Sequence, residues 1–483
     1  MKIRRGDLAV RVALSFGVLP GSLAAATWTV CPAGGGCSFT DIQSAIDAAS
    51  PGDTILVLPG SYPAFVLEKG LRILGVDPSL VTVSMTANPP SPFSPPVLPA
   101  TVRVNAIPAG QFALLAGMTI QVVTSPPLPY SSVFCSGNPV AALAVSNCAG
   151  AVTLSNLNLQ PGHYSHGIRA EGNAAVLADH VQVSASQIVG SVFSPTCYYY
   201  FGSYSGECPR AGVFSAATAL SLNSSSVLGM TSSSALVVEG SSSSHVAGTD
   251  LTGADGTGFA AVCIGGTLGL TTIGSRGGHG LEARNGAAVR VARGNGVAIE
   301  GGNGGTGYGG ASCPCISGLG GNGVDASGSS VLLAPGLSIL PGVNGGFPAV
   351  CFPPPTPSPI NGSVVTISPT PLPGLELTPV LSSPGGNTTF EVNGPSGAQF
   401  AVGVSLEPAF LSIPGIGGPL LLDPASLFVA FSGTLSPSGS ATIPIAIPPN
   451  PSLSEGVVFF QPAVVNATAG GVELGPAAAL VIL

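Results

Sequence analysis

The stretch Phe39 to Tyr62, FTDIQSAIDAASPGDTILVLPGSY, predicts one short helix followed by a strand. Thr40 with Gln43 three residues later matches a capping box, and apolar residues recur at helical spacing from Ile42 onward. A Pro-Gly pair ends this pattern, and the β-branched and aliphatic run from Thr54 to Leu58 follows. A short amphipathic helix is a common cover for the open first coil of a β-solenoid. We therefore expect a solenoid that begins here.

The same positions resemble the opening of many proteins of the pectate-lyase-like superfamily. That opening reads Phe-x-x-Ile-Gln-x-Ala-Ile, then Gly-Asp-Thr-Ile-x-Val, then Pro-Gly-x-Tyr. The matching residues are Phe39, Ile42, Gln43, Ala45, Ile46, Gly52, Asp53, Thr54, Ile55, Val57, Pro59, Gly60 and Tyr62. The resemblance implies a right-handed parallel β-helix. In that family the segment is structural, so the resemblance brings no catalytic residue with it.

A repeated position downstream agrees with such a fold. We expect one column of stacked core side chains, made of Ile168, Val213, Leu236, Phe259, Leu281 and Val324. Their spacings of 45, 23, 23, 22 and 43 residues fit a unit of 22 to 23 residues, doubled where a cysteine-bearing insertion intervenes. Segments of near-constant length are what stacked coils require, while insertions are free to vary.

Composition and turn signals divide the chain into four segments. Residues 1–26 match a signal peptide, with basic residues before an apolar run and an Ala-Ala-Ala cleavage site. Residues 27–352 are expected to form the β-helix, and residues 353–373 a stiff proline-rich linker. Residues 374–483 show short strands separated by turn signals, which predicts a β-sandwich. The expected fold class is therefore all-β, a parallel β-helix with a short N-terminal capping helix followed by a smaller β-sandwich.

Charge and hydropathy limit the partners. All 13 Lys and Arg residues lie at or before Arg293, so the later part of the chain lacks the basic surface of a nucleic-acid binder. After the leader, no stretch of 18 residues stays apolar, so we expect no membrane span. Removing residues 1–26 changes the net charge from -8 to -11. We expect a soluble or surface-associated protein that is secreted or held at the cell surface.

Ten cysteines suit an oxidising compartment. We expect local disulfides in the pairs Cys31/Cys37, Cys135/Cys148 and Cys197/Cys208. Two more are expected among Cys263, Cys313, Cys315 and Cys351, whose pairing the sequence leaves open. Cys313-Pro-Cys315 could instead be a redox or metal pair, but it has no companion histidine. We expect no metal site.

Two residues are weak catalytic candidates. Asp255 and His279 are 24 residues apart, about one coil, and Gly278-His279-Gly280 resembles a motif of polygalacturonases. That family also has an Asn-Thr-Asp, an Asp-Asp pair and an Arg-Ile-Lys, which this chain lacks. Short glycine motifs arise easily in a chain with 69 glycines.

An aromatic cluster is the best candidate for ligand binding. Tyr198, Tyr199, Tyr200 and Tyr204 lie between Cys197 and Cys208, so the expected disulfide would tie them into one loop. Exposed aromatic rings can stack on sugar rings. Alternatively, the loop folds back and these rings form its small core.

The expected function is that of a non-catalytic β-helix protein with a structural or carbohydrate-binding role, and polysaccharide is the expected partner. The alternative is a polysaccharide lyase or glycoside hydrolase acting on an acidic polysaccharide such as pectin. We expect no cofactor for the binder, and calcium for a lyase, because lyase chemistry needs carboxylates that converge on a metal. The sequence leaves open whether the protein is an enzyme.

Overall fold

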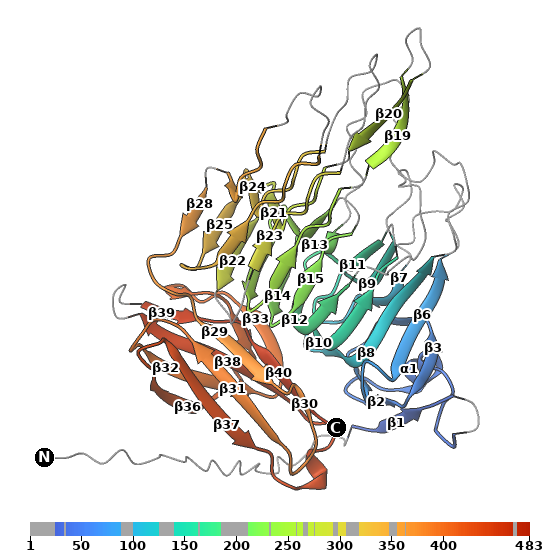
Figure 1. Cartoon of the computed structure of the whole chain (residues 1–483). Coiled ribbons are helices and arrows are strands. Elements are labelled where there is room, and N and C mark those ends of the chain that lie inside the picture. The colour runs from blue at the N-terminus through green and yellow to red at the C-terminus, as the bar shows by residue number, and fades with distance from the viewer. Residues whose placement is uncertain are drawn as a thin grey trace, which may run out of the picture.

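The computed structural model describes residues 25–483 apart from 33–34, 88–99, 125–139, 163–164, 185–210, 231–232, 257, 264–268, 275, 293–297, 306–317, 347–354, 363 and 467–470. These residues form two parts, a right-handed parallel β-helix and a β-sandwich that packs beside it (Figure 1). The predicted fold class is confirmed.

Two parallel sheets form three faces of the β-helix, because the larger sheet bends and supplies two of them. Face 1 consists of β1 (Thr27–Val30), β2 (Thr54–Val57), β5 (Arg72–Gly75), the first parts of β8 (Phe112–Thr124), β10 (Ala151–Gln160) and β12 (Ala175–Val183), and then β14 (Ala219–Asn223), β17 (Ser243–Ala247), β22 (Ala288–Ala292), β25 (Ser330–Leu333) and β28 (Val365–Ile367). Face 2 consists of β3 (Gly60–Pro63), β6 (Val81–Ala87), the second parts of β8, β10 and β12, and then β15 (Ser226–Leu228), β18 (Asp250–Thr252), β23 (Ala298–Glu300) and β26 (Ser338–Leu340). The third face, sheet B, consists of β4 (Phe65–Leu67), β7 (Ala100–Asn105), β9 (Val140–Ser146), β11 (Ser165–Glu171), β13 (Ala211–Ala216), β16 (Ser234–Glu239), β21 (Leu281–Arg284), β24 (Val324–Ser327) and β27 (Ile360–Asn361).

The bend between face 1 and face 2 is a single residue with positive φ in each middle coil. In chain order these residues are Gly117, Asn156, His180, Ser224 and Gly248. Glycine and asparagine tolerate this left-handed conformation better than other residues. One residue per coil is therefore enough to turn the sheet without a loop.

The predicted core column is present with one exception. Ile168, Val213, Leu236, Leu281 and Val324 are register partners on successive strands of sheet B and are fully buried. The prediction for Phe259 is wrong, because β19 (Gly258–Cys263) pairs antiparallel with β20 (Gly269–Gly274) in a hairpin outside the coil. The hairpin has the length of one coil, so spacing alone could not distinguish the two.

The first coil begins earlier than expected. Strand β1 pairs in parallel with β2, so the helix α1 (Ile42–Ala48) follows the first strand and does not precede it. The N-cap is Asp41, whose carboxylate accepts a hydrogen bond from Ser44 N over 2.8 Å, and the predicted capping box with Thr40 is wrong. Asp is preferred over Thr as an N-cap, which explains why the helix begins after Asp41. The buried face of α1 packs on the core at the start of the β-helix, as predicted.

Insertions enter the β-helix at one corner. The chain is short between sheet B and the next strand of face 1, but it is long between face 2 and sheet B at residues 88–99, 125–139, 184–210, 253–280, 301–323 and 341–359. In three of these segments glycines stack: Gly302 N donates to Gly278 O, Gly321 N to Gly302 O and Gly342 N to Gly321 O, each over 2.8 Å. A Cβ atom on Gly302 would overlap a carbonyl oxygen of the neighbouring segment. This packing explains part of the high glycine content.

The segment expected as a linker belongs partly to the β-helix. Within residues 353–373, β27 pairs with β24 and β28 pairs with β25, so the last coil continues past residue 352. The remaining residues lead directly into the sandwich. They do not hold it away from the β-helix, as an extended spacer would.

The C-terminal part is a sandwich of two sheets around its own core. One sheet orders β29 (Gly374–Thr378), β31 (Asn387–Asn393) and β37 (Ser440–Ala446), and the other orders β30 (Leu381–Ser382), β40 (Ala478–Ile482), β38 (Val457–Asn466), β32 (Gln399–Ser405) and β36 (Phe428–Thr434). Shorter elements at its rim are β33 (Pro408–Leu411), β34 (Ile416–Gly417), β35 (Leu420–Leu422), β39 (Gly471–Leu474) and the 3₁₀ helix η1 (Pro451–Leu453). Alternating residues fill the core, with Phe390 packed edge-on against Phe431 over 5.0 Å.

The sandwich covers part of face 1. Outward side chains of the β-helix, among them Leu114 and Leu177, are buried against Leu422 and Phe459 of the sandwich. Burying side chains of this size contributes about 1.5–3 kcal/mol each. Face 1 is thus largely an internal surface, whereas face 2 and sheet B retain outer faces of their own.

Candidate functional site

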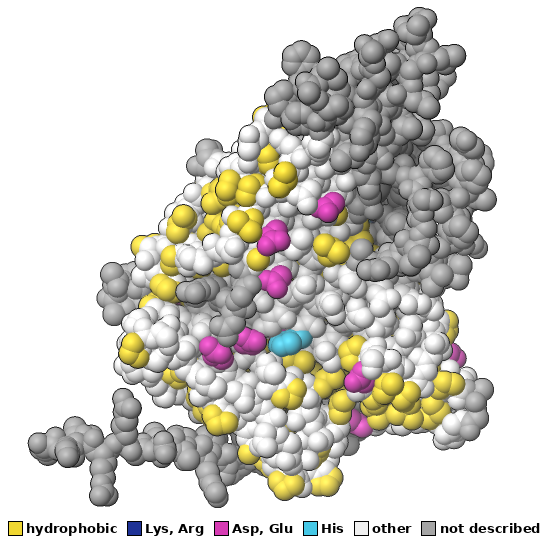
Figure 2. Space-filling model, in the orientation of Figure 1, with side chains coloured by type: hydrophobic (Ala, Val, Ile, Leu, Met, Phe, Trp, Pro, Cys, Tyr) yellow, Lys and Arg dark blue, Asp and Glu magenta, His cyan; other side chains and the backbone are white. Residues whose placement is uncertain are grey.

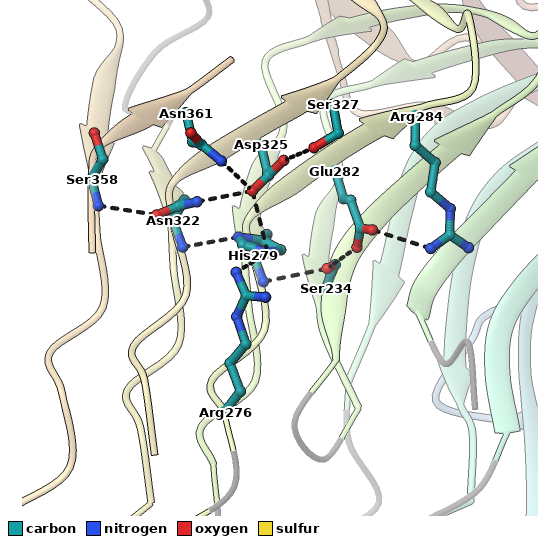
Figure 3. Close-up of polar contacts among 10 residues, drawn as sticks. All are labelled: Ser234, Arg276, His279, Glu282, Arg284, Asn322, Asp325, Ser327, Ser358 and Asn361. Atoms are coloured by element: carbon teal, nitrogen blue, oxygen red, sulfur yellow. Dashed lines mark hydrogen bonds and ion pairs between the residues drawn. The ribbon is translucent and has the colours of Figure 1, made fainter. Parts of the chain in front are cut away.

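A polar cluster lies on the outer face of sheet B, around His279 and Asp325 (Figure 3). Parallel pairing puts Glu282 of β21, Asp325 of β24 and Asn361 of β27 on successive strands in register. His279 lies just before β21, at the corner where insertions enter. The regular stacking of coils therefore brings together residues that are far apart in the sequence.

The Asp325 carboxylate is saturated with hydrogen bonds. It accepts from Asn322 Nδ2 and Asn361 Nδ2 over 2.9 Å each, and from Ser327 Oγ over 2.8 Å. Burial by itself would raise the pKa of Asp325, but these hydrogen bonds outweigh it and hold the pKa below the usual range. A carboxyl group that stays ionised cannot serve as the general acid that glycoside hydrolysis needs.

His279 is buried and neutral. The backbone N–H of Asn322 donates to its Nδ1 over 2.9 Å. Asp325 Oδ2 lies 3.7 Å from the other ring nitrogen, Nε2. Arg276 Nη2 lies 2.8 Å from the same Nε2. Burial, and then the positive charge of Arg276, lower the pKa of His279.

The glycines around His279 have a packing role. A Cβ atom on Gly278 would overlap the carbonyl oxygen of Ser233, and one on Gly280 would press on the side chain of Ile299. The resemblance of this tripeptide to a polygalacturonase motif is thus explained by close coil stacking.

Charged residues continue along the same face as ion pairs. Arg284 Nη1 lies 3.2 Å from Glu282 Oε1, and Arg284 Nη2 lies 3.1 Å from Glu239 Oε2. Ser234 Oγ donates to Glu282 over 2.8 Å. Glu239 and Glu282 both pair with Arg284, so the cluster forms a network that joins neighbouring coils.

The second catalytic candidate lies elsewhere. Asp255 is exposed, and its carboxylate accepts from Asn303 N over 2.7 Å. No hydrogen bond or ion pair joins it to His279 in the described residues. The structure does not bring the two candidates together. Among the described residues, no three His, Cys, Asp or Glu side chains gather as they would around a metal ion.

The predicted disulfides are partly described. The Cys31–Cys37 disulfide is confirmed. Cys148 is a free thiol, so its predicted disulfide with Cys135 is wrong. Its side chain is buried in the core and lies 3.3 Å from Ser146 O. The remaining cysteines fall outside the residues whose side chains the structure describes, namely Cys135, Cys197, Cys208, Cys263, Cys313, Cys315 and Cys351.

The aromatic candidates Tyr198, Tyr199, Tyr200 and Tyr204 also lie outside the described residues. Their role in ligand binding stays a prediction.

A polar groove that the sequence analysis missed lies on face 2. Its lining is dominated by uncharged hydrogen-bonding side chains, and its volume is about 500 Å³. The lining residues are Asp77, Pro78, Ser79, Thr82, Thr119, Gln121, Asn156, Leu157, Asn158, Gln160, His180 and Gln182. A second pocket of about 490 Å³ adjoins it at the boundary with the sandwich and shares Asp77, Asn156 and His180.

The groove contains a regular row of polar side chains. Thr82, Thr119, Asn158 and Gln182 are register partners on successive strands, and Ser226 and Asp250 extend the row. We call these six residues the polar row. Neighbouring strands are about 4.8 Å apart, so the row repeats at that interval along the β-helix.

The amides of the groove are not used for folding. Asn158 Oδ1 is buried without a hydrogen-bond partner. In the described part of the chain, the side-chain amides of Gln121, Gln160 and Gln182 also make no hydrogen bond. Among the residues that the structure describes, no Lys or Arg lines the groove. Figure 2 agrees, since its view shows acidic side chains and a histidine on the described surface and no basic side chain.

Comparisons with known proteins add little to this description of the structure. No family model matches the chain, and no curated protein matches it. Among solved structures, a match is the full-length tailspike protein 2 of Escherichia coli O157:H7 bacteriophage CAB120, with 12% identity and a TM-score of 0.21. It covers 91% of this chain and 65% of the tailspike chain, so this chain spans less than two thirds of that protein. A likeness this low carries no argument, and the fold rests on the strand pairing described above.

No helix among the described residues is both long and apolar enough to cross a membrane.

Proposed function

We propose that this protein is exported and binds an uncharged polysaccharide, without cleaving it, along the groove of face 2. The observation that carries the proposal is the pair Asn158 and Gln182, which lie in register on adjacent strands with amide groups that the fold leaves unused. An amide offers both donors and acceptors, and so does a sugar hydroxyl. A row that repeats with each coil suits a ligand that also repeats.

The charge of the groove favours an uncharged chain over an acidic one. Asp77 lines the groove, and Asp250 continues the polar row. Hydrogen bonds from Ser79 lower the pKa of Asp77, so this group is negatively charged at neutral pH. A polyuronate would meet repulsion from these carboxylates. Among the described lining residues there is no Lys or Arg, and His180, the basic side chain there, is already paired with Asp179. This is why we prefer a neutral glycan to the pectin-like substrate of the alternative hypothesis.

Two observations support export. Residues 1–26 have the composition of a signal peptide, and the Cys31–Cys37 disulfide is of a kind that persists in oxidising compartments.

Affinity electrophoresis and calorimetry with neutral and acidic polysaccharides test the proposal. We expect retardation by a neutral polymer and none by polygalacturonate. The double variant Asn158→Ala, Gln182→Ala should weaken binding by roughly thirtyfold, because it removes two or more hydrogen bonds worth about 1 kcal/mol each. Asn387→Ala, an exposed amide on β31 of the sandwich, is the matched control.

Three results would contradict the proposal. These are the lack of binding to any polysaccharide, equal binding by the double variant and the parent, and release of reducing or unsaturated sugars that His279→Ala abolishes. The last result would restore the lyase or hydrolase hypothesis.

A further inference from the structure

The two ends of the β-helix are finished differently. At the N-terminal end, α1 covers the first coil, and Gln43 Oε1 accepts from Val66 N on the edge strand β4 over 2.8 Å. Lys69 Nζ donates to Ala49 O over 2.6 Å beside it. Helical cover, charge and occupied edge groups are the usual means by which proteins stop further strand pairing. At this end the core is therefore covered by a helix, and an amide of the edge strand β4 is occupied.

The C-terminal end has open strand edges. In the described residues β26, β27 and β28 each pair with one strand only, on the side of the preceding coil. Val364 O and Ser368 N are both bonded to β25. Backbone groups alternate in direction along a strand, so the N–H and C=O groups of Val365 and Ile367 face the open side.

The same end exposes apolar side chains. Four of the exposed large apolar residues gather there: Leu340 (49%), Val343 (69%), Val364 (49%) and Ile367 (60%). Ile367 is the register partner of the fully packed Leu333, so it continues an inner column of the core with no coil above it. Figure 2 shows hydrophobic side chains gathered over the end of the β-helix where β25 and β28 lie in Figure 1.

Nothing charged protects this end. Residues 326–375 contain no Asp, Glu, Lys, Arg or His. Pro359 and Pro369 flank β27 and β28, but no proline lies inside β26, β27 or β28. An apolar edge without charges or internal prolines is the kind that pairs with another strand. Two identical copies of this surface can therefore meet without repulsion between like charges.

We propose that two copies of this chain associate through their C-terminal β-helix ends about a two-fold axis. The two-fold axis places β28 of one copy antiparallel to β28 of the other. Each unpaired N–H group of one strand then donates to an unpaired C=O group of the other. Such an interface is isologous and closes after two copies. The proposal is independent of glycan binding.

Sedimentation velocity and light scattering on the full mature chain test it across a dilution series. We expect twice the chain mass at high concentration and dissociation on dilution. Ile367→Lys places two like charges face to face across the axis and should weaken the dimer by about a hundredfold or more. Ile367 is largely exposed, so the variant should keep the parent's thermal stability in the monomer. Leu411→Lys, at an exposed apolar site on the sandwich, should leave the dimer unchanged.

Hydrogen exchange gives a second readout. The amides of Val365 and Ile367 should become protected as concentration rises, whereas amides of exposed sandwich loops should not. A chain that stays monomeric throughout would overturn the proposal. So would a dimer that Ile367→Lys does not weaken, or one without protection at β28, because either would place the interface elsewhere.

Discussion

Asp179 of the β-helix accepts a hydrogen bond from the backbone N–H of Ala479 in the sandwich over 3.1 Å, across 300 residues of sequence. The carboxylate is fully buried, and it also accepts from Asn223 Nδ2 and faces His180 Nδ1, each over 2.9 Å. Buried carboxylates are costly unless they are paired in this way. Asp179 thus fixes where the sandwich sits on face 1.

Asp179→Ala should loosen this docking. It leaves the Ala479 N–H and the Asn223 amide without an acceptor, at a cost of about 2–4 kcal/mol in the free energy of unfolding. Urea unfolding and limited proteolysis near residues 369–373 measure the effect. Asp179→Asn keeps one acceptor oxygen and should lose less. Equal stability of Asp179→Ala and the parent would show that the apolar contacts alone hold the sandwich.

Protonation of His245 should lower the free energy of unfolding in acid. His245 lies on β17 and is buried, and burial and then the charge of Arg290 lower its pKa to about 3. In the unfolded chain its pKa is near 6.5, so between these values only the unfolded state binds the proton. Stability should fall as pH decreases from 6.5 toward 3, by up to about 1.4 kcal/mol per pH unit for this group. Urea unfolding at several pH values should show a shallower acid slope for His245→Gln.

His180 should act in the opposite direction. Burial disfavours its charged form, but Asp179 and Glu376 outweigh that effect and raise its pKa. Its contribution is therefore fully present below pH 6.5 and is lost as pH rises through the native pKa. His180→Asn, which tolerates the positive φ of this position, should destabilise the protein more in mild acid than at alkaline pH. The same sign for both histidine variants would contradict the assignment.

Asp325→Ala should destabilise the protein, and it should leave glycan binding in the groove of face 2 unchanged. Three donors that now share its carboxylate would be left unsatisfied, at a cost of about 2–4 kcal/mol. Asp255→Ala removes one exposed contact and should cost less than about 1 kcal/mol. Thermal unfolding of the two variants compares them directly. If Asp255→Ala were the more damaging change, the cluster around His279 would not be a structural network.

Cys148 should resist alkylation in the folded protein. Burial raises the pKa of its thiol, and only the thiolate reacts. Peptide mapping after iodoacetamide treatment should find Cys148 modified only when denaturant is present, and Cys31 and Cys37 unmodified until they are reduced. A Cys148 peptide linked to Cys135 in a non-reduced digest would contradict the structure.

The sequence was most informative where the physical signal is local and repeated. The strands around Ile168, Leu236 and Val324 stack as predicted, because inward apolar residues must recur once per coil. The prediction for Phe259 was wrong because a hairpin can have the same length and composition as a coil. The end of the β-helix was misplaced because prolines near Cys351 indicate an interruption, and they do not show whether one more coil follows.

The groove was missed for a different reason. Its signal is present as amides that alternate with aliphatic residues, as in Leu157-Asn158-Leu159-Gln160 and Val181-Gln182-Val183. Each pattern predicts only a half-buried strand. Their function depends on which strands become neighbours and which face the sandwich leaves open, and neither follows from one segment. Conversely, His279 drew notice through a short motif that the packing of glycines explains.

The corner at which long segments leave the β-helix separates two kinds of change. Apart from the segments whose glycines stack, an insertion there can grow, shrink or be exchanged without changing the strand pairing, because the paired strands lie on either side of it. The residues exposed at this corner can therefore change between related proteins while the stacked strands stay the same. A graft of foreign peptide between residues 184 and 210 is the place where such a scaffold should accept new recognition most readily.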